Sequence, residues 1–86
     1  MRNIYIVDAF LVNENGVFGR MDGYPKQIDS VNYDGDVDKA RKRAEGYFAK
    51  VWGAFCDRDD RKQQTVILYS MDGTVIERKT TGTLNE

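Results

Sequence analysis

The chain contains no histidine, and this absence excludes more functions than any other. Ser-His-Asp and Cys-His triads, histidine proton shuttles and most zinc or haem sites need an imidazole. We therefore expect a protein that binds rather than catalyses. The sequence points to no metal, no cofactor and no small-molecule substrate.

Cysteine and long apolar runs are also scarce. Cys56 is the one cysteine, so an internal disulfide is impossible, and a reducing cytosol is the simplest compartment. No segment approaches the ~20 apolar residues of a membrane span, and the first residues lack an apolar stretch that ends in a small-residue cleavage site. The expectation is a soluble, unprocessed, cytoplasmic protein without a membrane partner.

Net charge is nearly absent, at −1 over 86 residues, but this value hides a segregation of charge. Residues 3–38 carry seven acids against Arg20 and Lys26, a balance of −5, whereas residues 39–62 carry a balance of +4. A chain with this polarity can bind charged partners without being basic overall.

Two hairpin signals flank one amphipathic segment. Asn15-Gly16 follows an apolar run from Asn3 to Val12 and predicts a type I′ turn, with a second strand from Val17 to about Tyr24. Residues 25–35 read as a connection, with Ile28, Val31 and Tyr33 tucked against the core. Residues 65–70 and 74–79 read as two further strands joined through Met71-Asp72-Gly73.

A helix is predicted from about Asp36, its N-cap, to about Asp57, with Asp38 in the first turn. Its apolar residues recur at spacings of three and four and form one stripe flanked by Tyr47 and Trp52. The stripe comprises Val37, Ala40, Ala44, Phe48, Val51 and Phe55.

The predicted fold is α+β, with a four-stranded antiparallel sheet in the order hairpin, helix, hairpin, and the helix packed on one face. A lone hairpin is marginally stable and the helix must bury its stripe, so this is the economical arrangement. We expect one domain over residues 1–79 and a flexible polar tail over residues 80–86.

The first hairpin predicts a sheet with two apolar faces. A two-residue loop at Asn15-Gly16 sets Phe10 opposite Met21 and Val12 opposite Gly19, on the face with Ile4 and Ile6 that the helix covers. The second face then carries Tyr5, Val7, Ala9, Leu11, Phe18, Arg20, Asp22 and Tyr24. A register slip of one residue exchanges these two sets, although both faces stay apolar.

Two interpretations of the second face stay open. In the first, the connection over residues 25–35 folds back and covers this face. In the second, the face meets a partner protein or a second copy of the chain. Under the second interpretation the candidate binding residues are Tyr5, Val7, Leu11, Phe18, Arg20 and Tyr24.

Single-stranded nucleic acid is the alternative partner. Its bases would stack on Tyr5, Phe18 and Tyr24 beside Arg20, with the basic helix attracting phosphate. Against this, the same hairpin belongs to the acidic half of the chain, and no RNP-like aromatic motif is present.

The outer face of the helix is a second candidate surface, with Lys39, Lys42, Arg43, Gly46, Lys50 and Gly53. Gly46, Ala49 and Gly53 fall at i, i+3 and i+7 and make a groove of small residues that a partner backbone could approach. The competing interpretation is an ordinary solvated face, where tertiary context tolerates the ~1 kcal/mol that each glycine costs.

One apparent metal motif fails. Asp34, Asp36 and Asp38 alternate and Glu45 stands at the twelfth place, as in an EF-hand loop. The sixth place, which needs glycine, is Lys39, and helix capping explains the same acids. The hypothesis from the sequence as a whole is a small regulator or inhibitor, of the kind that phages and mobile elements encode, that acts through contact with another protein or with a second copy of the chain.

Overall fold

The computed structural model describes residues 2–12, 15–57 and 63–81. Five strands form one sheet beside a long helix. The elements follow in the order β1 (Ile4–Val12), β2 (Phe18–Arg20), β3 (Lys26–Asp29), the 3₁₀ helix η1 (Ser30–Tyr33), α1 (Val37–Cys56), β4 (Gln64–Ser70) and β5 (Val75–Thr81). The predicted α+β class is confirmed, and the antiparallel sheet has five strands where the sequence predicted four. No helix in these described ranges is long and apolar enough to cross a membrane.

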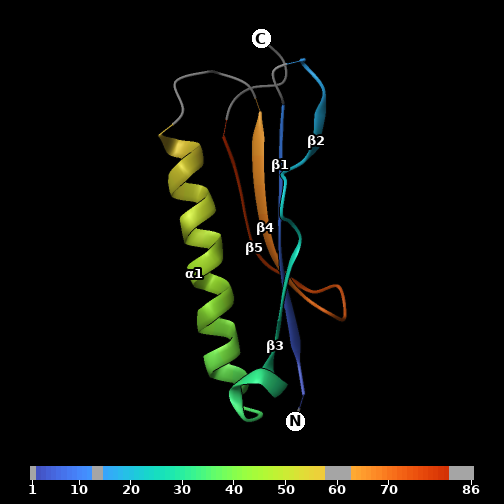
Figure 1. Ribbon diagram of the computed structural model, residues 1–86, viewed down its shortest axis with the longest axis vertical. Helices are drawn as coiled ribbons and strands as arrows, with labels where there is room; N and C mark the ends of the chain where they lie inside the picture. Colours follow the sequence, from blue (N-terminus) through green and yellow to red (C-terminus); the bar gives the residue numbers. More distant parts are fainter. Residues whose placement is uncertain (1, 13–14, 58–62, 82–86) are drawn as a thin grey trace.

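β1 is the central strand, and α1 lies along one side of the sheet (Figure 1). The sheet order is β2-β1-β4-β5, and β3 also pairs with β1. β4 occupies one edge of β1, from Tyr5 to Leu11. The other edge is shared, because β3 pairs with residues 4–7 and β2 with residues 10–12.

The interpretation of residues 25–35 as a plain connection is wrong. The predicted second strand stops at Arg20, which leaves the first half of the β1 edge without partners, and β3 supplies the backbone hydrogen bonds that this edge requires. Between β2 and β3 a turn is closed by the Tyr24 amide, which donates to the Met21 carbonyl at 3.2 Å. Pro25 follows in a cis peptide bond.

The segment over residues 25–35 also does not cover the sheet face that lies opposite the helix. Ile28 is buried, but it is paired with Tyr5 on the side that α1 covers. Tyr33 is half-buried against the same core, and Val31, predicted to tuck inward, is 61% exposed. η1 packs against α1 and β3, so this segment extends the helix-covered layer.

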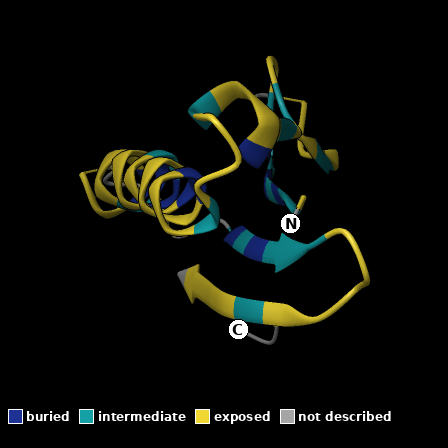
Figure 2. Ribbon diagram, turned by 90° about the horizontal axis from the view of Figure 1, so that it is seen from below, coloured by how far each residue is buried: buried dark blue, intermediate teal, exposed yellow. Residues whose placement is uncertain are grey.

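The helix prediction is confirmed at both ends. The Asp36 side chain accepts a hydrogen bond from the Lys39 amide at 3.1 Å, Asp38 lies in the first turn, and Asp57 is the C-cap. Every residue of the predicted stripe except the half-buried Val37 is buried. Figure 2 shows the buried residues of α1 on the side toward the sheet and exposed residues on its outer side.

The register of the first hairpin differs from the prediction by one residue. Val12 pairs with Phe18 and Phe10 pairs with Arg20, so five residues connect the strands. This register excludes the two-residue loop of a type I′ hairpin, although Gly16 has the positive φ, 79°, that such turns use.

This one-residue difference exchanges the β1 residues between the two faces, whereas Phe18 and Arg20 of β2 stay on the face turned away from α1. The odd-numbered residues of β1 face α1: Tyr5, Val7 and Ala9 are buried, and Leu11 packs against the same core. The even-numbered residues, which the sequence placed under the helix, face away from it. Asp8 explains the preference, because under α1 its carboxylate would be buried among apolar side chains, whereas on the other side it meets Arg20.

The C-terminal hairpin forms as predicted, with small differences in its bounds. β4 begins at Gln64 and β5 continues to Thr81, two residues into the stretch predicted as a tail. Thr80 pairs with Thr65, and their hydroxyl oxygens are 3.1 Å apart. Residues 82–86 lie outside the described residues.

Candidate functional site

The side of the sheet turned away from α1 is the candidate site, and we call it the open face. Strand pairing places the following side chains on it: Ile4, Ile6, Asp8, Phe10, Val12, Phe18, Arg20, Gln27, Asp29, Thr65, Ile67, Tyr69, Val75, Arg78 and Thr80. Within the described ranges, the one α-helix and η1 both lie on the opposite side (Figure 1). More than half of these side chains are apolar or aromatic.

An ion pair lies at the centre of the open face. Asp8 is only 3% exposed, and its two carboxylate oxygens accept hydrogen bonds from Nε and Nη2 of Arg20, each at 2.9 Å. One of the oxygens also accepts from the Ala9 amide at 2.9 Å. The hydrogen bonds that Arg20 donates to Asp8 raise the pKa of Arg20, so this guanidinium stays charged. A bidentate pair of this kind fixes both side chains.

Two aromatic rings adjoin the ion pair. The rings of Phe10 and Phe18 stack with centroids 6.0 Å apart, and the guanidinium carbon of Arg20 lies 5.3 Å from the Phe10 centroid. Phe18 is 48% exposed. Stacking and cation–π contact therefore hold a large, water-exposed ring in one orientation before any partner arrives.

Lysine is segregated from the open face. Among the described residues, three lysines lie on α1 and two on the helix-covered side of the sheet. Of the latter, Lys26 has its ammonium 5.6 Å from the Tyr24 ring centroid, and Lys79 has its ammonium 5.5 Å from that of Trp52. The cations within the open face are Arg20 and Arg78. Arginine and aromatic residues without lysine are typical of the centres of protein interfaces.

The structure separates the six residues predicted for the second sheet face. Phe18 and Arg20 lie on the open face, but Tyr5 and Val7 are buried beneath α1 and Leu11 points to the helix side. Tyr24 is half-buried on the helix side too, where burial, and secondarily Tyr47, raises its pKa. The prediction that these six residues form one surface was therefore wrong.

Sequence reasoning missed most of the open face, including Phe10, Ile67 and Tyr69. The signal that could have found it is Asp8. This residue interrupts the even-numbered apolar set of β1, while the odd-numbered set from Tyr5 to Leu11 has no charge and is the better floor for a helix.

The predicted helix outer face exists as a surface. Its six residues, Lys39, Lys42, Arg43, Gly46, Lys50 and Gly53, are all exposed. A Cβ added at Gly46 or Gly53 would meet nothing within 4 Å. Arg43 is held locally, with its guanidinium carbon 4.6 Å from the Tyr47 ring centroid and a 3.2 Å hydrogen bond to the Tyr47 hydroxyl.

The basic helix and the open face lie on opposite sides of the sheet. The nucleic-acid hypothesis required both on one surface, so that bases could stack while phosphates met lysine and arginine. On the open face Arg20 is already paired with Asp8, and the second carboxylate there, that of Asp29, is paired with Arg2. This arrangement gives the nucleic-acid alternative no support.

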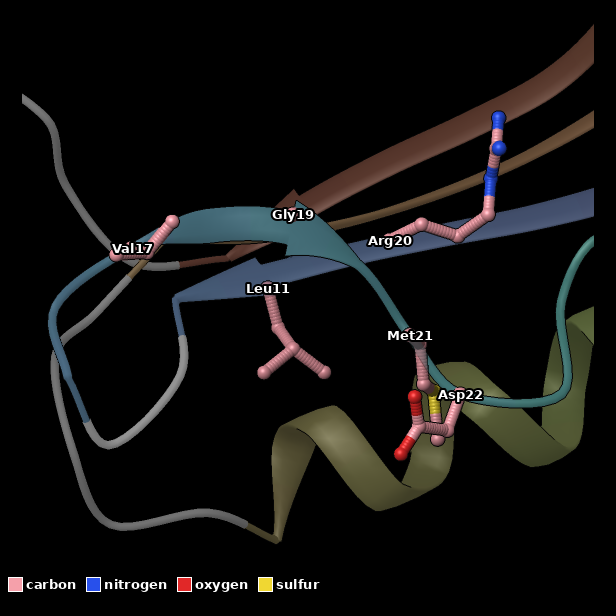
Figure 3. Close-up of a pocket in the computed structure, with 6 residues that line it drawn as sticks. All are labelled: Leu11, Val17, Gly19, Arg20, Met21 and Asp22. Carbon is pink, nitrogen blue, oxygen red and sulfur yellow. The ribbon is translucent and has the colours of Figure 1, made fainter.

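An open pocket of about 360 Å³ lies beside β2, lined by Leu11, Val17, Gly19, Arg20, Met21 and Asp22. Figure 3 shows the Leu11, Met21 and Asp22 side chains directed toward α1, whereas the Arg20 side chain extends to the other side of the strands. Of the Asp8–Arg20 pair, Arg20 lines the pocket and Asp8 does not. Among the residues that the structure describes, no cluster of three or more metal-ligating side chains occurs.

No protein-family model, curated protein or solved structure matches the chain.

Proposed function

We propose that this chain is a non-catalytic binding protein whose contact surface for another protein is the open face. The observation that carries the proposal is a sheet face, rich in aliphatic and aromatic side chains, that no described helix or strand covers. Contiguous apolar surface of this kind on a small domain marks a contact site. Ordinary solvated antiparallel strands alternate apolar and polar residues instead.

The arrangement of the open face also supports specific contact. Phe18 supplies an exposed ring, and the Phe10 stack and the Asp8–Arg20 pair hold its surroundings rigid. Side chains ordered before association lose little conformational entropy on binding. Phenylalanine, tyrosine and arginine together form the kind of anchor cluster that dominates binding energy in interfaces.

We further propose that the biological role is regulation or inhibition in the cytoplasm by occupying a surface of the partner. The chain's size and its lack of histidine favour steric action over chemistry. An origin in a phage or mobile element fits a domain of this small size and is part of the same proposal.

Site-specific photocrosslinking tests the proposal in cells that naturally contain the protein. A benzophenone amino acid at Phe18 reports on the open face, and the same amino acid at the exposed Ala49 of α1 is the matched control. We expect a discrete adduct from position 18 and none from position 49. No adduct at position 18, or the same adducts from both positions, would contradict the proposal.

A further inference from the structure

We propose that the protein bound at the open face is a second copy of this chain, so that two sheets stack face to face around a two-fold axis. This inference rests on the proposed function, because it names the occupant of the same surface. Stacked sheets pack about 10 Å apart with interdigitating side chains, which suits a face of aliphatic and aromatic residues.

The size of the open face fits a dimer. It is four strand positions wide, and its strands are about seven to nine residues long along β1, β4 and β5. At ~4.8 Å between strands and ~3.3 Å per residue, this gives a flat footprint of roughly 500 Å². Two such faces bury about 1,000 Å² even before the extra area of the protruding side chains is added. This is about the smallest buried area expected of a specific interface.

The charges of the open face permit contact with an identical face. A two-fold interface brings each patch against itself, so an unneutralised charge at its centre would meet its own copy. The central charges are neutralised within the chain, since Asp8 and Arg20 form their bidentate pair. The net charge of −1 also leaves little repulsion between two copies.

Two further charged residues lie at opposite borders of the open face, Arg78 on β5 and Asp29 on β3. Asp29 is neutralised within the chain as well, because the Arg2 guanidinium pairs with its carboxylate at 2.7 Å. A two-fold axis parallel to the strands brings the β5 border of one copy over the β3 border of its partner. This orientation keeps the two Arg78 side chains apart and is favoured over the one that stacks β5 on β5, which brings these like charges together.

Sedimentation equilibrium of the full chain over a wide concentration range tests the proposal. We expect a species of twice the 9.9 kDa chain mass. Phe18→Asp and Val75→Asp introduce carboxylates at side chains that are 48% and 58% exposed, so the fold tolerates them. We expect each to weaken dimerisation by at least about thirty-fold, since a carboxylate would be buried without a partner. Ala49→Asp on α1 is the control and leaves the dimer intact.

The outcomes separate this inference from the proposed function. A chain that stays monomeric at every concentration overturns self-association, and an adduct between position 18 and a protein of different mass then leaves the proposed function standing. A dimer that persists in both aspartate variants, with unchanged circular dichroism, overturns the open face as the dimer contact. A monomer with no adduct at position 18 overturns both proposals.

Discussion

Arg20 donates to both carboxylate oxygens of Asp8 at 2.9 Å, although the two side chains differ sharply in exposure: 51% for Arg20 and 4% for Asp8. The carboxylate is withdrawn from water, and the guanidinium covers it from the solvent side. The pair thus places a buried negative charge inside a sheet face that is otherwise largely apolar. Its stability depends on both partners being present.

Asp8→Asn is expected to lower the free energy of unfolding by about 1–3 kcal/mol, because the charge-assisted hydrogen bonds from Arg20 lose their anionic acceptor. Urea denaturation measures the change. Asp22→Asn, at an exposed position two residues after Arg20, is the matched control and should change stability little. Equal effects of the two substitutions would mean that the ion pair does not stabilise the fold.

Gln64→Met is expected to stabilise the protein by up to about 1 kcal/mol. Gln64 is 1% exposed, its Oε1 has no hydrogen-bond partner among the residues that the structure describes, and its Nε2 donates to the Phe55 carbonyl at 3.5 Å. Replacing an unsatisfied buried amide by an apolar side chain of similar volume removes a desolvation penalty.

The neighbouring residue provides the comparison for Gln64. Thr65 has its hydroxyl 3.1 Å from that of Thr80, so Thr65→Val removes a satisfied hydrogen bond and should not stabilise. Thermal unfolding gives the melting temperatures of both variants for this comparison. A lower melting temperature for Gln64→Met than for the unsubstituted chain would show that the amide is satisfied in solution.

Gly46→Ala is expected to raise the free energy of unfolding by about 1 kcal/mol, because alanine has the higher helix propensity and its Cβ meets nothing within 4 Å. Gly73→Ala is the control. It also has open space, but its φ of +94° disfavours any side chain, so this substitution should destabilise. Denaturant unfolding distinguishes the two, and destabilisation by both would indicate that residue 46 lies in a packed environment.

The stabilising effect of Arg2 is expected to disappear in acid. Its guanidinium hydrogen-bonds Asp29, with the shortest distance 2.7 Å, and this bond, together with the Val31 amide, lowers the pKa of Asp29 below its ordinary 3.8. A lowered carboxyl pKa contributes stability that is present above pH 3.8 and is lost as the pH falls through the lowered value.

Melting temperatures of Arg2→Gln and the unsubstituted chain should therefore differ slightly near neutral pH and converge below about pH 3.8. Lys42→Gln, which removes a positive charge from the exposed outer side of α1, is the control. A difference for Arg2→Gln that persists at the lowest pH would show that the bond to the Asp29 carboxylate is not its source.

The helix was the most predictable element because local rules determine it. Asp36 caps the first turn through its own side chain, and a spacing of three and four residues sets which side chains are buried. Neither feature depends on distant parts of the chain. The C-terminal hairpin was similarly predictable, since Gly73 gives its turn a local signal.

The candidate site was less predictable because it depends on register. Asn15-Gly16 favours a two-residue loop locally, but burial of the odd-numbered β1 residues beneath α1 outweighs this preference. A one-residue difference then decides whether Phe10 or Leu11 meets solvent. β3 was missed for a related reason. Its four residues form a strand because they pair with β1, and their own sequence does not predict one.

The distribution of lysine has a practical consequence for chemistry performed on this protein. Acylating reagents that attack lysine amines, including biotin esters and amine-coupled surfaces, reach the described lysines on α1 and on the helix-covered side of the sheet. Enzymes that acetylate or ubiquitinate lysine face the same distribution. Among the residues described, a chain tethered through a lysine amine is therefore held from its helix side and presents Phe18 and Arg20 outward.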